Sequence, residues 1–267
     1  MDQDSTAKCT PWAITRRPGV ALARCELTHL AREPIDPERA LEQHAAYRAA
    51  LEGAGCRLID LPELPEHPDA PFVEDPVLVL DELAILPCAG AGSRAGEQAS
   101  LIPTLERHRE LVRMEAPTTL EGGDVLRTGD TLYVGWSKRT NHPGLKALAH
   151  LVIEYGYAVK AIEVRGCLHL KTALTALDHD TLLANKRWVN LERVRGKRIL
   201  AVDPREPFGG NVLRVGERLF ASSAYPRTNE RIRAAGFEID ELELGEFHKA
   251  EAGLTCLSVL FEDAAAS

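Results

Sequence analysis

The sequence has no long apolar run: its clusters, such as Val77–Leu80, are far shorter than the roughly 18–20 residues that a membrane-spanning helix needs. The stretch Met1–Thr10 is polar and lacks the apolar core of a secretory signal. Basic side chains are also in deficit, because 32 of them face 40 acidic ones and leave a net charge of −8. We therefore expect a cytoplasmic protein that binds neither membranes nor nucleic acids, since phosphate binding requires a positive surface.

Cysteine is sparse, with 6 in 267 residues, and no two cysteines form a Cys-x-x-Cys pair. This density is too low for a disulfide scaffold, and the missing pair argues against structural zinc, so we expect no metal and no cofactor. What is present is a 45% share of hydrophobic residues, which suffices for a globular core. The acidic balance favours a small cationic ligand, because a negative field speeds the encounter with cations.

An internal repeat is the most informative pattern. Four segments read as an apolar run, a tight polar turn and a second apolar run: 76–86, 124–134, 172–184 and 211–221. Each of them is a β-hairpin signal. Cys256–Phe261 resembles half of a fifth unit, and Trp12–Thr15 could supply its partner strand.

Helical patterns lie between the hairpins, over Pro37–Ala54, Pro103–Arg113, Pro143–Tyr155 and Thr228–Ala235. The recurring unit is hairpin, helix and strand, and five such units around an axis would form a closed α/β propeller. We expect a single domain over residues 1–267, with an ordered core of about 11–263. The proline-rich piece Leu61–Pro76 is then a long ordered loop and not a domain boundary.

Short segments, most of them with titratable side chains, stand just before the four hairpins and the fifth half-unit. These are the segments Glu74-Asp75, Glu121–Asp124, His169–Lys171, Gly209–Asn211 and Thr255-Cys256. If rotation relates the units, these positions converge at one end of the axis and bring together a nucleophile, a base and carboxylates. Taken singly, each has a plainer interpretation: Cys256 as a core cysteine, His169 as a buried histidine, and Gly209–Asn211 as a segment that serves backbone geometry.

Five motifs together resemble one known family. They are Pro68–Asp75 (PDAPFVED), Glu121–Asp124 (EGGD), Ser137–Asn141 (SKRTN), Leu168–Thr172 (LHLKT) and Gly253–Ser258 (GLTCLS). In this order and spacing, over about residues 15–261, they are similar to the dimethylarginine dimethylaminohydrolases of the guanidine-modifying pentein superfamily. The resemblance implies a five-unit α/β propeller. It also implies hydrolysis of Nω-substituted L-arginine to L-citrulline and an alkylamine through a cysteine thiouronium intermediate.

The resemblance also implies a role for each matching residue. Cys256 would attack the guanidinium carbon, His169 would protonate the departing amine and then activate water, and Glu121 would hold His169. The implied substrate-binding residues are Asp75 and Glu74 for the guanidinium, Arg94 and Arg139 for the α-carboxylate, and Asp69, Leu27 and Ala250 for the amino-acid end. Glu251, near the nucleophile, replaces the aspartate usual in the family. Its additional methylene leaves the identity of the guanidinium substituent open.

Two other classes of function compete with this one. Another pentein guanidine enzyme, such as an arginine deiminase, a hydroxyarginine hydrolase or an amidinotransferase, would use the same core residues, but deiminases and amidinotransferases are usually longer. A non-catalytic binding module would usually have lost a catalytic residue, whereas Cys256, His169 and Glu121 are all present. The expected partner is a small guanidine substrate, and a homodimer is compatible with the fold but not required by it.

Overall fold

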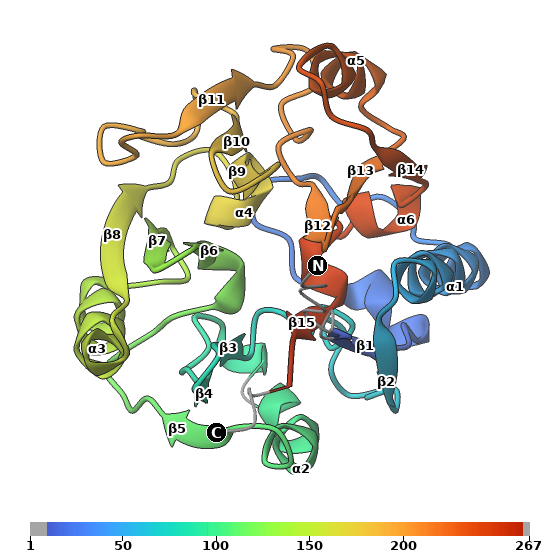
Figure 1. Ribbon diagram of the computed structural model, residues 1–267. Helices are drawn as coiled ribbons and strands as arrows, with labels where there is room; N and C mark the ends of the chain where they lie inside the picture. Colours follow the sequence, from blue (N-terminus) through green and yellow to red (C-terminus); the bar gives the residue numbers. More distant parts are fainter. Residues whose placement is uncertain (1–9, 95, 264–267) are drawn as a thin grey trace, which may run out of the picture.

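The computed structural model describes residues 10–94 and 96–263, which form five three-stranded sheets around a common centre (Figure 1). Most of the polar N-terminal stretch, Met1–Cys9, lies outside the described residues. Within the described part, no helix combines the length and the apolar character that a membrane crossing requires. The cysteines of this part, which are Cys25, Cys56, Cys88, Cys167 and Cys256, are all free.

Each sheet joins an antiparallel pair to a third, parallel strand. The predicted hairpins are β3 (Leu78–Val79) with β4 (Leu83–Leu86), β6 (Val125–Thr128) with β7 (Thr131–Trp136), β9 (Leu174–Ala176) with β10 (Thr181–Ala184), and β12 (Leu213–Val215) with β13 (Arg218–Ser222). Their parallel third strands are β5 (Glu110–Arg113), β8 (Ala158–Glu163), β11 (Arg198–Ala201) and β14 (Asp240–Leu242). In the fifth sheet β1 (Trp12–Arg16) pairs with β15 (Val259–Phe261) and with β2 (Arg57–Leu61). The predicted five-unit α/β propeller is confirmed.

The longer helices α1, α3 and α5 lie on the rim, outside the ring of sheets (Figure 1), whereas the short helix α4 lies toward the centre. The α-helices are α1 (Pro37–Gly53), α2 (Ile102–Leu105), α3 (His142–Val152), α4 (Leu170–Ala173), α5 (Pro226–Ala234) and α6 (Gly245–His248). Short 3₁₀ turns are η1 (Val20–Arg24), η2 (Gly92–Arg94), η3 (Glu97–Ser100), η4 (Gly122–Asp124), η5 (Ile153–Tyr155) and η6 (Thr255–Leu257). Asp36 caps α1, because its carboxylate accepts the N–H groups of Glu38 and Arg39.

Two of the predicted elements are wrong in part. The predicted helix Pro103–Arg113 ends at Leu105, and its second half is β5, whose backbone pairs with the open edge of β4. The buried Arg109 guanidinium fixes the reversal between them, since its Nε lies 2.8 Å from the carbonyl oxygen of Leu80. The predicted strand Cys256–Phe261 begins only at Val259, because Thr255–Leu257 forms the turn η6. Cys256 is therefore held on a turn before the strand.

The apolar interior lies between neighbouring sheets. One cluster joins Ile14 of β1 and Val259 of β15 to Leu86 of β4, together with Val73 and Val77. Val73 belongs to the proline-rich loop Leu61–Pro76 and is completely buried. This loop is thus packed into the interior, and it brings the acidic residues at its end to the centre of the ring.

Candidate active site

The segments that carry Asp75, His169 and Cys256 meet around a small pocket of about 20 Å³, whereas Gly209–Asn211 does not line it. Its lining residues are Glu26, Asp69, Phe72, Asp75, Arg94, Arg139, Leu168, His169, Ala250, Glu251, Ala252 and Cys256. Asp75, His169 and Cys256 come from three different units, as the repeat predicted. The pocket has room for about one water molecule, which needs roughly 10–15 Å³.

His169 lies between two carboxylates. Its Nε2 is 2.6 Å from Oε2 of Glu121, and its Nδ1 is 3.7 Å from Oδ1 of Asp75. The other oxygen of Glu121 accepts the N–H of Gly90 at 2.9 Å. Glu121 is therefore not part of the pocket lining but lies behind the imidazole, where it fixes the orientation of the ring.

Charge in this cluster favours an imidazolium. Burial alone would lower the pKa of His169, but Asp75 and Glu121 outweigh it and raise the pKa to about 9. Burial likewise acts to raise the pKa of Glu121, and the contact with His169 outweighs it and lowers this pKa. At neutral pH the pair is an imidazolium beside a carboxylate. Such a ring can donate a proton to a departing amine.

Cys256 stands on η6, where its Sγ lies 3.5 Å from the donating backbone nitrogen of Gly253. Burial, followed by the charges of Asp75 and Glu74, raises the pKa of the thiol to about 12. The free protein therefore carries a neutral thiol. A cation bound beside the same carboxylates would stabilise the thiolate, the reactive form.

Comparison with known proteins identifies the family to which this chain belongs. A family model described as arginine deiminase matches residues 103–207. The chain is 36% identical to a dimethylarginine dimethylaminohydrolase of Pseudomonas aeruginosa over 85% of its own length and 90% of the relative's. It is 38% identical to the enzyme of that name from Streptomyces coelicolor, over 92% and 95%. The chain belongs to the dimethylarginine dimethylaminohydrolase family.

Solved structures agree with this membership. The Pseudomonas aeruginosa enzyme, as a cysteine-to-serine variant complexed with citrulline, superposes with a TM-score of 0.87 at 34% identity and covers 93% of this chain and 98% of its own. The N-terminal domain of ArgZ, a cyanobacterial arginine dihydrolase, superposes with a TM-score of 0.81 at 19% identity over 95% and 98% of the two chains, which shows the shared fold alone.

The Glu74 side chain stabilises the turn η6, which carries Cys256, and does not line the pocket. One of its carboxylate oxygens lies 2.5 Å from Nζ of Lys171, and the other accepts the hydroxyl of Thr255 at 2.9 Å. Asn211 closes the network, because its side-chain oxygen accepts the Thr255 N–H at 3.2 Å. The sequence analysis missed Lys171 and Asn211, although both lie in segments that it had marked before hairpins. Together these groups fasten the residue next to Cys256.

Arg94 lines the pocket, but protein oxygens occupy its guanidinium. Its Nη1 is 2.5 Å from Oδ2 of Asp75, its Nε and Nη2 contact the Glu97 carboxylate at 2.7–3.1 Å, and Nη2 also donates to the carbonyl of Phe72 at 3.0 Å. Asp75 Oδ1, by contrast, has no hydrogen-bond partner in the part of the chain that the structure describes. Sequence reasoning missed Glu97, for which the three-residue spacing from Arg94 was the available signal.

Arg139 also lines this pocket. Its Nη1 is 3.5 Å from Oε1 of Glu121, and its Nη2 is 3.7 Å from Oε2 of Glu26. Glu26 was also missed, and only its place beside Leu27 pointed to it. Its Oε1 accepts the hydroxyl of Ser93 at 2.5 Å, so Glu26 joins two loops at the pocket mouth.

The motif Glu121–Asp124 positions more than the one carboxylate predicted from it. A side chain at Gly123 would come within 2.6 Å of Asp75 and 2.7 Å of His169, so the close approach of these two groups requires glycine. The buried Asp124 accepts the Leu170 N–H at 2.8 Å and the hydroxyl groups of two further residues, Ser137 at 2.6 Å and Thr140 at 2.7 Å. Asp124 thus ties the His169 segment to the loop that carries Arg139.

Of the remaining predicted residues, Asp69, Ala250 and Glu251 line the pocket, whereas Leu27 does not. The Asp69 carboxylate accepts the Glu26 N–H at 3.2 Å, and burial raises the pKa of Asp69 to about 6. Leu27 is half-buried against the neighbouring apolar cluster, and it does not line the pocket although Glu26 does. Glu251 stands in the wall, but its carboxylate turns to the backbone of 28–30.

The buried cluster could also accept a metal ion. One donor atom from each of Asp75, Glu121 and His169 lies within 4.8 Å of the other two. The imidazole Nε2 already contacts Oε2 of Glu121 at 2.6 Å, whereas Nδ1 lies 3.7 Å from Oδ1 of Asp75. The expectation that the enzyme needs no metal stays a prediction.

Proposed function

We propose that this protein hydrolyses Nω-methylated L-arginine to L-citrulline and an alkylamine. Family membership and the known citrulline complex of a relative support the substrate class. The observation that carries the proposal is the convergence of Cys256 and His169, with Glu121 behind the ring and Asp75 beside it, at one pocket. These groups supply a nucleophile, a proton donor with its orienting carboxylate, and an anion for a guanidinium.

Attraction between opposite charges would place the substrate in the pocket. The unpartnered Oδ1 of Asp75 offers an acceptor to a guanidinium N–H, and Arg139 offers donors to the α-carboxylate. The substrate's positive charge beside Asp75 would lower the pKa of Cys256, so that the thiol releases its proton to solvent as the substrate binds. The substrate thereby helps to activate its own nucleophile.

The reaction then takes two steps. The Cys256 thiolate forms a bond to the guanidinium carbon, and the C–N bond to the methylated nitrogen breaks as the His169 imidazolium gives that nitrogen a proton. The product is a thiouronium on the cysteine and a free alkylamine. Neutral His169 then takes one proton from water, whose oxygen attacks the same carbon. The C–S bond breaks as the new hydroxyl loses its proton to solvent, which releases citrulline and leaves the Cys256 thiolate and the His169 imidazolium.

A deiminase activity on unsubstituted arginine is the second candidate, because the arginine deiminase family model matches residues 103–207. It would use the same bonds and the same residues, with ammonia as the leaving group. Substrate choice therefore depends on the space around the substituent and not on the catalytic groups.

One assay tests the proposal. Citrulline release is measured with purified enzyme on monomethyl-, asymmetric dimethyl-, hydroxy- and unsubstituted arginine at one pH. We expect the highest kcat/KM on a methylated arginine. Highest activity on arginine itself would replace the proposal by a deiminase, and no release from any of the four would contradict both. The cytoplasmic location and the single-domain organisation stay predictions.

A further inference from the structure

Glu251 makes an unusual contact for a residue next to an active site. Its Oε1 accepts three successive backbone N–H groups, those of Thr28 at 3.0 Å, His29 at 2.5 Å and Leu30 at 2.5 Å. More than 220 residues separate the two sides of this contact. One carboxylate oxygen thereby gathers the chain of a segment that has no helix or strand of its own, between η1 and α1.

The backbone at Glu251 is strained to make this contact. Its φ is +58°, the one positive value at a non-glycine residue in the described chain. A side chain in this region costs roughly 1–2 kcal/mol and persists where the surroundings hold it. The second oxygen, Oε2, is buried without a hydrogen-bond partner among the described residues. Neither feature helps folding by itself, so both point to a role for the carboxylate.

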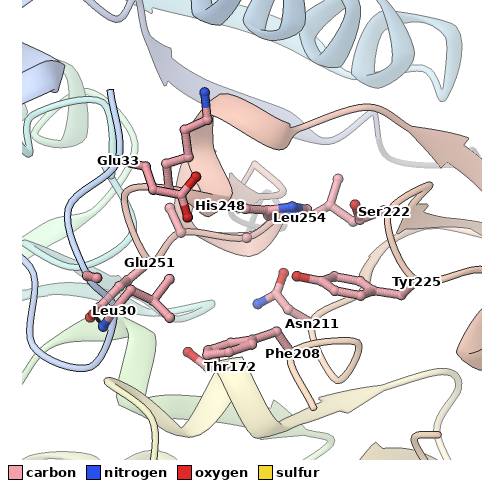
Figure 2. Close-up of a pocket in the computed structure, with 14 residues that line it drawn as sticks. Leu30, Glu33, Thr172, Phe208, Asn211, Ser222, Tyr225, His248, Glu251 and Leu254 are labelled. Carbon is pink, nitrogen blue, oxygen red and sulfur yellow. Dashed lines mark hydrogen bonds between the residues drawn. The ribbon is translucent and has the colours of Figure 1, made fainter. Parts of the chain in front are cut away.

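Glu251 also lines two adjoining cavities. It lines the 20 Å³ pocket with Cys256, and it lines an adjoining cavity of about 240 Å³ together with Leu30 and Ala31. Figure 2 shows Glu251 beside Leu30 at one edge of this larger cavity. The segment 26–31 therefore covers both cavities, and Glu251 fastens it at the point where they adjoin.

The size of the smaller pocket gives this contact a consequence. A space for about one water molecule cannot admit an arginine derivative, so part of the wall must move for substrate to enter. Segment 26–31 contributes Glu26 to the wall and, like the loop that carries Asp69 and Phe72, has no helix or strand of its own. Asp69 and Phe72 are buried, whereas Glu26, Thr28 and His29 are exposed, so segment 26–31 is the part of the wall that can move with the least loss of packing.

We propose that Glu251 is a positioning residue that fastens segment 26–31 over the active site and thereby sets the rate at which substrate enters and product leaves. The proposal rests on the proposed function for the identity of that substrate. We call the contact between Glu251 Oε1 and the N–H groups of Thr28, His29 and Leu30 the latch. Because the latch holds the segment closed with or without a ligand, weakening it speeds both association and dissociation. A residue that contacts substrate would instead change mainly the dissociation rate and therefore the affinity.

Three substitutions separate the latch from the backbone strain. Glu251→Gly relieves the positive φ but removes the acceptor, Glu251→Ala removes the acceptor and keeps the strain, and Glu251→Gln keeps an acceptor of the same length. Glu243→Ala is the matched control. Its carboxylate lies nearby in the chain, contacts Gln43 and Arg39, and touches neither the segment nor the pocket.

The first measurement needs no substrate. Hydrogen exchange at the Thr28–Leu30 amides is expected to speed up about tenfold or more in Glu251→Gly and Glu251→Ala, less in Glu251→Gln, and not in the control. Alkylation of Cys256 by iodoacetamide at a fixed pH should speed up in the same order. Unchanged exchange in both Glu251→Gly and Glu251→Ala would overturn the latch, whatever the enzyme's substrate proves to be.

The second measurement uses Cys256→Ser as the background, so that ligand binds without turnover. Stopped-flow binding of L-citrulline should give association and dissociation rates that both rise about tenfold in Glu251→Gly, with Kd changed less than about threefold. A Kd change carried by dissociation alone would overturn the proposal and make Glu251 a substrate contact. If the glycine and alanine variants fail to fold, equal exchange in Glu251→Gln and its shorter analogue Glu251→Asp would also overturn it.

Discussion

The guanidinium of Arg94 lies on the carboxylate of Asp75, with 2.5 Å between Nη1 and Oδ2 and both side chains buried. Family resemblance gives Asp75 to the substrate's guanidinium and Arg94 to its α-carboxylate. In the free protein the Arg94 guanidinium is shared between the carboxylates of Asp75 and Glu97, so that one buried cation faces two acidic groups. Substrate binding must therefore use the open oxygen of Asp75 or move Arg94. Arg94 consequently has a structural role in addition to the predicted one.

The first prediction separates the two arginines. Arg94→Ala should lower the free energy of unfolding by about 3–5 kcal/mol, because it leaves the carboxylates of Asp75 and Glu97 buried without their cation. Arg139→Ala is the matched comparison. Its ion pairs are longer, at 3.5 and 3.7 Å, so we expect a loss below about 2 kcal/mol together with a KM increase of about tenfold or more. Urea unfolding and citrulline kinetics measure the two effects.

A second substitution checks the cause of the Arg94 effect. Adding Glu97→Gln to Arg94→Ala removes one of the two unpaired charges and should recover part of the lost stability. Equal unfolding free energies for Arg94→Ala and Arg139→Ala, or no recovery in the double variant, would show that the buried ion pair does not carry the stability assigned to it.

The second prediction concerns the nucleophile. Cys256→Ser should lower kcat by at least about 10³-fold, because a hydroxyl without strong activation is a poor nucleophile. Substrate binding should persist, since the guanidinium and α-carboxylate contacts come from other residues, and calorimetry with a methylated arginine measures it. Cys88→Ser is the control: its Sγ donates to the Met114 carbonyl, outside the pocket, and serine keeps that donor. Substantial citrulline formation by pure Cys256→Ser protein would refute a covalent step.

The third prediction uses the charge state of His169. Its imidazolium must be present to protonate the amine, and its pKa is raised to about 9, so kcat/KM should fall as pH rises through about 9. Glu121→Gln removes a carboxylate that raises this pKa and should move the descending limb to lower pH. Asp81→Asn, an exposed carboxylate paired with Arg127, should leave the limb in place. A limb that does not move in Glu121→Gln would exclude His169 as the titrating group.

The raised pKa of His169 also makes the stability of the folded protein depend on pH. The folded-state pKa of His169 lies above the ordinary value of about 6.5. Its contribution to the unfolding free energy is therefore fully present below pH ~6.5 and lost as pH rises through about 9. In Glu121→Gln, unfolding by urea at pH 6 and at pH 9.5 should differ less than in the wild type.

Much of the fold could be predicted because its units repeat: hairpins around 81 and 129 show the same apolar and polar pattern, and the ring closes where β1 pairs with β15 in place of a fifth hairpin. The error at Pro103–Arg113 arose because a strand in a parallel sheet has no turn of its own to mark it. The convergence of His169 and Cys256 on one pocket, with Glu121 behind the imidazole, could be predicted because His169 and Glu121 precede hairpins and Cys256 precedes the strand β15. The contacts of Glu26 with Arg139 and of Lys171 with Glu74 could not, since they join segments that only folding brings together, whereas Glu97 was missed although it lies three residues from Arg94.

The last prediction concerns Asp124, whose carboxylate touches neither pocket nor substrate. It accepts the Leu170 N–H and the hydroxyl groups of Ser137 and Thr140, so it holds the segments of both His169 and Arg139. Asp124→Asn replaces one acceptor oxygen by a donor that must face one of these donors. The loss of a buried hydrogen bond to a charged group should cost about 1.5–3 kcal/mol of unfolding free energy.

Displacement of both segments should also lower kcat and raise KM together, although Asp124 itself takes no part in the chemistry. Asp81→Asn serves again as the exposed control and should change neither quantity. The measurement pairs urea unfolding with citrulline kinetics on the best substrate. Because Glu121 remains beside His169, the pH limb near 9 should move less than in Glu121→Gln, which distinguishes a positioning carboxylate from the one that contacts the ring. Wild-type stability and wild-type kinetics in Asp124→Asn would contradict this role.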